Sequence, residues 1–444
     1  MTQEVTIVGA GWAGLAAAIK ATQQGWTVHL IEATQTPGGR AKSVNHQGKV
    51  FDNGQHALIG AYQETLSLMK TLGLEPDALF ERQGLGWCYS SGAPFGLPKD
   101  PLPFKTLRSL LLNARFSPLE KLSLLKPVQF WIKHRFLNPS DTSVAQLFHG
   151  VSDTLMRDII SPLCLSALNT PLDRASASTF VRVLKDAFSN PPDSCSFLFP
   201  KKPLSDIFPI RSLEWLKSRG ARIELGRRID ALNDIDVNAP CILAVPAWQA
   251  AKLTRDSHPN WSGMAGGLTH KAIASVYIKG HPKESRRGER TALQSQLVCF
   301  NEHMELDNCV HPQFGIRLNA QAMQTPLIPP TLQGTSPEHW ALIVSVADPH
   351  RRQDIVQNAM AVARNQLGLE DLDMQFCTIE KRATFSCEAL SKRPPTVIAQ
   401  GLFACGDYVQ GPYPSTLEGA VRSGLRAVAC LDKKQTGAPV NPGV

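Results

Sequence analysis

The first residues with an evident chemical use are three glycines near the N-terminus. Gly9, Gly11 and Gly14 form a Gly-x-Gly-x-x-Gly motif between the β-rich run 5–8 and an apolar helical pattern over 15–22. Glycines at this spacing let the backbone turn tightly and approach a pyrophosphate. The free N–H groups and the positive dipole at the helix start then hold the phosphates. The motif predicts a dinucleotide site at a strand-to-helix turn.

The context of this motif strengthens the prediction. Gly25 ends the predicted helix, 26–31 reads as a second strand, and Glu32 closes it. A carboxylate roughly 20 residues beyond the glycine motif suits a ribose 2′-hydroxyl and repels a 2′-phosphate. We therefore expect Glu32 to bind the ribose of the dinucleotide.

A second glycine loop stands where the next crossover of a simple NAD domain would continue. It contains Gly38, Gly39 and Arg40. The alternative for this loop is a surface turn carrying a solvated arginine, which is the less favoured interpretation. With the preceding motif it resembles the flavin amine oxidase and phytoene desaturase superfamily. The resemblance implies that these three residues face the pyrophosphate and flavin of a non-covalently bound FAD.

The C-terminal part of the chain resembles the other half of such a site. A buried strand is predicted over 401–405 and a helix over 416–431. The resemblance implies FAD contacts at Gly406, Asp407, Thr416 and Leu417. A helix N-terminus at the pyrimidine edge would stabilise the negative charge of a reduced flavin. Alternatively, Asp407 is an ordinary turn residue and Glu418 a first-turn carboxylate that stabilises its own helix.

The middle of the chain returns once to the predicted cofactor domain. Residues 212–250 read as a helix, a strand and a second strand ending at Pro246, and the superfamily places the equivalent of Ile229 near the adenine. No second Gly-x-Gly-x-x-Gly motif follows, which argues against a separate NAD(P)H domain. We expect electrons from transiently bound NAD(P)H or from another reductant.

These observations predict a chain that is α/β plus α+β. A Rossmann-type FAD-binding domain would comprise 1–84, 211–250 and 381–444. By subtraction, 85–210 and 251–380 would form a substrate-binding domain, an antiparallel sheet with helices over one face. The length of 444 residues and the hydrophobic content of 43% suit two interleaved domains.

Composition excludes several other classes of protein. The ten cysteines show no CxxC pair and no zinc spacing, so we expect reduced thiols and no metal site. The N-terminus has no export signal and no apolar run is long enough to span a bilayer, which favours a cytoplasmic protein. Although the net charge is +8, no nucleic-acid-binding pattern is present.

Residues 101–136 form an unusual segment with seven basic residues and one acidic residue. It predicts a helical contact with an anionic membrane surface, in which basic side chains bind headgroups and apolar ones enter the interface. A core-facing helix pair with a solvated basic side is an equal alternative. The candidate basic residues are Lys105, Arg108, Arg115, Lys121, Lys126, Lys133 and Arg135; the candidate apolar residues are Leu110, Leu111, Phe116, Leu124, Phe130 and Trp131.

Several short stretches resemble one family more closely. They are Asp52 to His56 (DNGQH), Pro162 to Cys164, Ala167 to Pro171 (ALNTP), Leu204 to Pro209 (LSDIFP) and Ala244 to Gln249 (AVPAWQ). These stretches are similar to the hydroxysqualene dehydroxylases, bacterial enzymes that reduce hydroxysqualene to squalene for hopanoid precursors. The resemblance is weakest over about 279–337, so substrate details that depend on that stretch are least supported.

The resemblance implies that a hydride replaces an allylic hydroxyl after an acid has helped water to leave. Gly54 and Gln55 would then contact FAD. His56 is the first candidate acid because it would lie beside the flavin and titrates near neutral pH, and Tyr413 is the second. Alternatively, His56 starts a helix or positions the backbone, and Tyr413 only forms part of the pocket wall.

Other functions remain compatible with the same cofactor site. A carotenoid desaturase or isomerase would act on another polyisoprenoid, whereas an amine oxidase is disfavoured because no covalent-flavin cysteine context or aromatic cage is evident. An FAD-containing scaffold without activity is disfavoured by Glu32 and Asp407. The resemblance further implies a peripheral location on the inner face of the cell membrane and association with squalene-pathway prenyl synthases.

Overall fold

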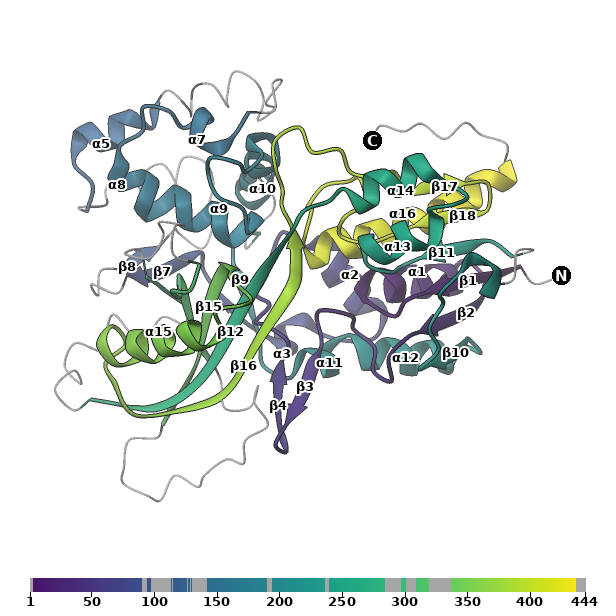
Figure 1. Ribbon diagram of the computed structural model, residues 1–444, viewed down its shortest axis with the longest axis horizontal. Helices are drawn as coiled ribbons and strands as arrows, with labels where there is room; N and C mark the ends of the chain where they lie inside the picture. Colours follow the sequence, from purple (N-terminus) through teal and green to yellow (C-terminus); the bar gives the residue numbers. More distant parts are fainter. Residues whose placement is uncertain are drawn as a thin grey trace.

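The protein is described by a computed structural model with two large sheets, two smaller ones and a layer of helices (Figure 1). The described residues are 3–89, 94–96, 113, 115–125, 127, 129, 142–189, 194–235, 239–283, 297–300, 309–318 and 337–436. Within them, no helix is long and apolar enough to cross a membrane. All ten cysteines are free thiols.

The first sheet has six strands drawn from distant parts of the sequence. Their order is β10 (Arg222–Leu225), β2 (Thr27–Glu32), β1 (Glu4–Val8), β11 (Cys241–Leu243), β18 (Leu402–Ala404) and β17 (Val397–Ala399). All neighbours pair in parallel except β17 with β18. A parallel sheet must be covered on both faces, which explains the continuous apolar runs of β1 and β2.

Helices cover both faces of this sheet. On one face α1 (Trp12–Gln23), α12 (Pro209–Lys217) and α16 (Leu417–Thr436) share an apolar cluster with β1 and β2. On the other, Leu253 of α13 (Ala247–Thr254) packs against the strands. The N-terminal and C-terminal strands thus lie in one Rossmann-type layer, as the sequence predicted.

The second sheet has seven strands and lies beside the first (Figure 1). Its order is β16 (Leu369–Phe385), β12 (His270–Pro282), β15 (Glu338–Ala347), β14 (Phe314–Leu318), β13 (Leu297–Cys299), β7 (Gly86–Tyr89) and β8 (Pro94–Gly96). Only β13 and β7 pair in parallel. Helix α15 (Arg352–Asn365) packs its buried side on one face, which confirms the predicted antiparallel sheet with a helix over one side.

Three of the four predicted domain limits fall inside secondary-structure elements, the one at 210/211 within α12. The limit at 250/251 lies within α13, and the limit at 380/381 lies within the long strand β16. Because β16 continues to Phe385 in the second sheet, residues 381–385 extend the antiparallel sheet toward the first sheet. The division into two functional domains stays a prediction.

A helical layer covers the other end of the second sheet. It contains α5 (Pro118–Ser123), α7 (Val144–Leu147), α8 (Asp153–Leu155), the π-helix η1 (Met156–Ile160), α9 (Ser161–Leu168) and α10 (Ala177–Ser189). The fully buried Asp158 anchors it: Arg115 donates to Oδ2 at 2.7 and 2.9 Å, and Arg157 donates to Oδ1 at 2.8 Å. The Arg115 guanidinium also lies 4.1 Å from the ring centroid of Tyr89 on β7.

The Arg115–Asp158 contact shows that part of the predicted membrane contact is wrong. Arg115 binds the buried Asp158 rather than offering its charge to headgroups, and Phe116 and Leu124 are core residues with 2% and 9% exposure. They pack inward because the Arg115–Asp158 contact fixes that turn of chain against β7. Of the other candidates only Lys121 is among the described residues.

Smaller elements complete the fold. They are the hairpin β3 (Ser43–His46) and β4 (Lys49–Asp52), the sheet of β5 (Leu58–Ile59), β9 (Phe197–Pro200) and β6 (Phe80–Gln83), the helices α2 (Gln63–Thr71), α3 (Pro76–Leu79), α11 (Leu204–Ile207) and α14 (Pro259–Gly266), and the 3₁₀ turn η2 (Leu232–Asp234). His56 lies in the loop after β4, seven residues before α2 begins, so the helix-start interpretation of this residue is wrong.

Candidate active site

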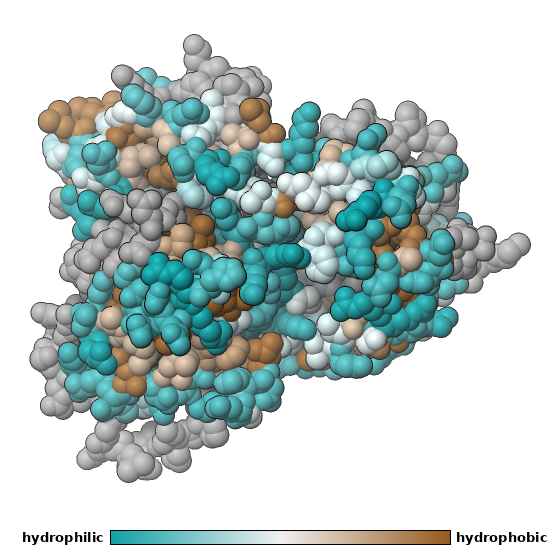
Figure 2. Space-filling view, in the orientation of Figure 1, coloured by the Kyte–Doolittle hydropathy of each residue, from teal (hydrophilic) through white to brown (hydrophobic). Residues whose placement is uncertain are grey.

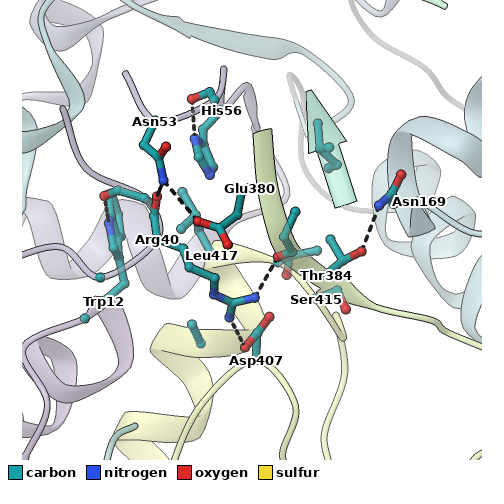
Figure 3. A pocket seen from close by; sticks show the side chains of 18 of the residues that line it. Trp12, Arg40, Asn53, His56, Asn169, Glu380, Thr384, Asp407, Ser415 and Leu417 are labelled. Atoms are coloured by element: carbon teal, nitrogen blue, oxygen red, sulfur yellow. Dashed lines mark hydrogen bonds and ion pairs between the residues drawn. The ribbon is translucent and has the colours of Figure 1, made fainter. Parts of the chain in front are cut away.

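One cavity of about 690 Å³ is lined by both sheets and by the helical layer. All the predicted site residues except Gly14 line it. These are Gly9, Gly11, Glu32, Gly38, Gly39, Arg40, Gly54, Gln55, His56, Ile229, Gly406, Asp407, Tyr413, Thr416 and Leu417. The fold therefore brings candidates from both ends of the chain to one space (Figure 3).

The glycine motif makes a cradle at the start of α1. Gly9 has φ +109°, and a Cβ there would stand 2.4 Å from the carbonyl oxygen of Ala244. The loop containing Gly38 lies directly on this turn, because its N–H donates to the carbonyl of Ala10 at 2.8 Å. Gly14 lies outside the cavity, and its lack of a side chain lets α1 pack on the Gly9 carbonyl.

Two further features of this cradle fit a dinucleotide. Helix α1 has no side-chain cap at its N-terminus, so N–H groups of its first turn are left for a phosphate. Tyr408 lines the cavity with 2% exposure, and its hydroxyl has no hydrogen-bond partner among the described residues. Because a buried hydroxyl without a partner is costly, a bound polar group is expected there. The residues present fit FAD.

Glu32 is fixed in the cavity wall by three donors. Its Oε2 accepts from the Ala10 N–H at 2.7 Å, and its Oε1 accepts from the backbone N–H and the hydroxyl of Thr34, both at 2.8 Å. A carboxylate oxygen accepts more than one hydrogen bond. The arrangement therefore holds the carboxylate still and leaves capacity for a ribose hydroxyl.

Arg40 joins the two ends of the chain inside the cavity (Figure 3). Its Nη2 lies 2.5 Å from Oδ1 of Asp407, and its Nη1 donates to the carbonyl of Ala383 at 2.6 Å. The two charged residues are 367 positions apart in the sequence. The solvated-arginine and simple-turn alternatives are therefore wrong for this pair, because each side chain fixes the other.

A second polar contact lies next to this ion pair. Asn53 donates from Nδ2 to Oε2 of Glu380 at 3.2 Å, and its Oδ1 accepts from the hydroxyl of Thr378 at 2.8 Å. It ties the loop after β4 to β16 (Figure 3). Gln55, in the same loop, donates to the hydroxyl of Tyr277 at 3.0 Å.

Asp52, the last residue of β4, fixes the start of this loop. Its Oδ1 accepts from the Ser43 hydroxyl at 2.7 Å and from the Leu204 N–H at 2.9 Å. Burial raises the pKa of Asp52 to about 6, although both hydrogen bonds act in the opposite direction. The protonated form is thus favoured in the folded state relative to the unfolded chain.

We expect this raised pKa to appear in the pH dependence of stability. Because the folded protein holds the proton more tightly, the contribution of Asp52 is greatest below its ordinary pKa and is lost as the pH rises toward about 6. Asp52→Asn removes the titration and keeps an oxygen for Ser43 and Leu204. The variant should gain up to about 3 kcal/mol relative to wild type between about pH 4 and pH 7. Thermal unfolding of both proteins across this range is the test; a constant difference in Tm would contradict the prediction.

His56 is held by its own loop. Its Nδ1 lies 2.9 Å from the carbonyl of Gly54, so this nitrogen carries the proton and Nε2 is the one left for exchange. Burial lowers the pKa of His56, the Gly54 contact opposes this, and the nearby Arg40 charge lowers it further. The imidazole is therefore neutral at pH 7 in the absence of a bound anion.

Tyr413 is the less suitable proton donor. Burial raises the pKa of its phenol, and its hydroxyl is hydrogen-bonded to Asp186 on α10, which raises that pKa further. Its ring packs edge-on against Tyr62 with centroids 6.1 Å apart. The residue has φ +57° and places its carbonyl to accept from Thr416, which caps α16. Tyr413 thus forms cavity wall and helix start.

The remaining wall of the cavity is apolar. It comes from α9, α10, β9 and the second sheet, and its members include Leu165, Leu168, Phe180, Leu184, Phe197, Phe199, Leu297, Phe314, Ile316 and Ile343. A wall of this kind excludes water and suits a long hydrocarbon. It opens into the same space as the glycine cradle.

Sequence reasoning missed four polar residues of the wall. Asn53 and Asn169 stood in the family-like stretches without an assigned role, Tyr408 follows Asp407 directly, and Glu380 lies in the part inferred by subtraction. Asn169 has φ +44° at the end of α9, donates to Thr384 and accepts from the Val346 N–H. The sequence could have indicated Asn169, because an asparagine directly after an apolar helix often ends that helix in the left-handed conformation.

The Rossmann-type sheet, the glycine cradle and the paired Arg40 and Asp407 define an FAD-dependent oxidoreductase. Residues 7–72 match the family model described as an NAD(P)-binding Rossmann-like domain. The fold is similar to a crystal structure of an oxidoreductase from Methanosarcina mazei, with a TM-score of 0.69 and 14% identity, covering 96% of this chain and 100% of that one.

Comparison with known sequences narrows the class. The chain is 23% identical to the hydroxysqualene dehydroxylase of Zymomonas mobilis over 95% of its own length and 97% of that protein. It is 24% identical to the hydroxysqualene dehydroxylase of Rhodopseudomonas palustris, over 96% and 98% respectively. The chain is therefore similar to the hydroxysqualene dehydroxylases along nearly all of its length.

Proposed function

We propose that the protein reduces hydroxysqualene to squalene, replacing the allylic hydroxyl with hydrogen. The observation that carries this proposal is a single cavity in which a dinucleotide cradle meets an apolar wall. The similarity to hydroxysqualene dehydroxylases along the whole chain supports the same substrate. Bound FAD, once reduced, supplies the hydride, and a proton from the protein completes the loss of the hydroxyl as water.

The protein's own residues have separate tasks in this proposal. Gly9, Glu32 and the start of α1 hold the adenosine and phosphate part of the cofactor, while the Arg40–Asp407 pair fixes the wall of the flavin half. The apolar side chains of α9 and α10 orient the hydrocarbon and exclude water, which strengthens every charge contact inside. NAD(P)H or another reductant would restore the reduced state.

His56 is the proton donor in this proposal. Its Nε2 is the exchangeable nitrogen, and the pKa below the ordinary value makes the protonated form a strong acid but a minor one at pH 7. His56→Gln should slow turnover by about a hundredfold while the flavin content stays at the wild-type level. The wild-type rate should rise as the pH falls toward the histidine pKa, and the variant should lose this rise. An unchanged pH profile in the variant would assign the proton to another group.

The substrate is tested by product analysis. Purified protein is incubated without oxygen with hydroxysqualene, detergent and dithionite or NADPH, and the extract is analysed by mass spectrometry for squalene. In parallel, oxidised protein is incubated with phytoene, since a carotenoid desaturase would lengthen the chromophore and shift its absorption. Squalene formation supports the proposal, whereas a coloured product with hydroxysqualene unchanged would replace it by the desaturase activity.

We further propose that this reaction takes place on the cytoplasmic side of the cell membrane, beside the prenyl synthases of the squalene pathway. The support is the chemistry of the substrate: a polyisoprenoid alcohol partitions into lipid, and a reductase with an apolar cavity must collect it there.

A further inference from the structure

Three leucines on and just after α5 are exposed on the surface of the helical layer. Leu119, Leu122 and Leu125 are 79%, 55% and 43% exposed and follow one another at a spacing of three residues. Only seven large apolar residues of the described chain have more than a third of their surface exposed, and three of them fall in this short stretch. They contribute apolar surface at the upper left of the molecule, where α5 lies (Figures 1 and 2).

This leucine ridge, Leu119, Leu122 and Leu125, is presented by an anchored helix. Ser117 and Glu120 form a reciprocal capping box, with Oε2 of Glu120 accepting from the Ser117 N–H at 2.7 Å. Ser123 accepts from the Ser152 N–H at 3.1 Å at the other end of α5. Phe116 and Leu124 hold the underside in the core. The exposed leucines are thus a fixed feature of the surface, and a fixed apolar ridge marks an interaction site.

The charge of the sequence around the ridge indicates its partner. The segment 101–136 has seven basic residues and one acidic residue in its sequence. Arg115 is paired with Asp158 and the acidic Glu120 is committed to the helix cap, so the sequence of the segment keeps an excess of six positive charges. Leucines amid an excess of positive charge match a bilayer that carries anionic headgroups. The helix is far too short to span a membrane, so the contact would be interfacial.

The core beneath the ridge continues to the cavity. Phe116 and Leu124, which support α5, belong to the same apolar cluster as Leu165, Phe180 and Leu184 of the cavity wall. Apolar packing therefore runs without interruption from the ridge to the candidate substrate site. We propose that Leu119, Leu122 and Leu125 insert into an anionic membrane surface and seat the cavity against the bilayer. Only the idea that substrate arrives from that bilayer rests on the proposed function.

The test uses the full protein and vesicles without substrate. Sedimentation with vesicles of phosphatidylcholine and phosphatidylglycerol should show binding that is weaker with phosphatidylcholine alone. The triple variant L119S/L122S/L125S should partition on the order of 10- to 100-fold more weakly. The control is L390S, which removes a leucine that is 78% exposed in a turn at the end of β16; it should bind like wild type. Flavin content and Tm confirm that both variants are folded.

Two results would overturn the proposal. One is equal binding of wild type and triple variant to the anionic vesicles. The other is a wild-type dimer in lipid-free solution that becomes a monomer in the triple variant, because the ridge would then be covered by a second copy of the chain. The reaction in detergent gives an independent readout: the triple variant should retain hydroxysqualene reduction there, so a failure of the proposed activity in all proteins is distinguishable from a failure to bind membranes.

Discussion

Gly9→Ala is expected to yield a protein that no longer retains FAD. The backbone at Gly9 has φ +109°, a conformation that L-residues with a side chain rarely adopt, and the new Cβ would stand 2.4 Å from the Ala244 carbonyl oxygen. The strain alone costs roughly 1–3 kcal/mol, and relieving the clash must move the turn that approaches the pyrophosphate. We expect at least about a hundredfold weaker FAD binding, which corresponds to about 3 kcal/mol. The ratio of flavin to protein absorbance after purification, followed by titration with FAD, measures it.

Gly25→Ala is the matched control for this variant. Gly25 has φ +85° and follows the end of α1, but a Cβ there would meet nothing within 4 Å. This substitution adds backbone strain without altering the cradle, so it should lower stability slightly and leave the flavin content unchanged. If Gly9→Ala retained flavin as well as Gly25→Ala does, the cradle would not be the phosphate site.

Glu418→Ala should cost about 3–5 kcal/mol of the free energy of unfolding. Glu418 is fully buried in the first turn of α16, and its carboxylate caps the start of another helix, α2. It accepts from the backbone N–H groups of Glu64 and Thr65 at 3.1 and 3.0 Å, from the Thr65 hydroxyl at 2.7 Å, and from Nε of Arg422 at 2.7 Å. Removing it leaves the Glu64 and Thr65 N–H groups and the Thr65 hydroxyl without their acceptor, and it removes the ion-pair partner of Arg422. Urea unfolding followed by fluorescence gives the difference.

The control for this loss is Glu214→Ala. Glu214 pairs with Arg211 on the exposed side of α12, where its side chain is 58% exposed, and such pairs contribute less than about 1 kcal/mol. If the free energy of unfolding of Glu418→Ala lay within about 1 kcal/mol of that of this control, water would satisfy the donors that Glu418 binds, and the prediction would be wrong. The contacts of Glu418 with Glu64 and Thr65 also hold α2 against α16.

The residues that local spacing defines were predicted best. Gly9, Gly11 and Glu32 belong to one strand–helix–strand unit, so their positions follow from the periods of helix and strand. Glu418 shows the limit of the same reasoning. Its first-turn position suggested support of its own helix, whereas the structure has it capping α2, more than 350 residues away in sequence. Only the packing of α16 on α2 reveals that role.

The basic segment shows a second limit. Its leucines and phenylalanines have similar hydrophobicity, so their spacing predicts a helix but not which side is buried. The answer comes from Asp158 and Tyr89, which bind Arg115 and thereby turn Phe116 inward. Among the described residues of the segment, the exposed leucines are Leu119, Leu122 and Leu125, which were not predicted, whereas the predicted Leu124 is buried. The protonation state of His56 could not be predicted from the sequence either, because its lowered pKa depends on burial and on the nearby Arg40 charge.

A single-turnover experiment tests the central claim most directly. The purified protein is reduced without oxygen, the excess reductant is removed, and hydroxysqualene in detergent is added while the flavin spectrum is recorded and the extract is analysed for squalene. The account predicts that the oxidised flavin spectrum returns as squalene forms, with one squalene for each flavin. A flavin that stays reduced while all of the hydroxysqualene is recovered would contradict it.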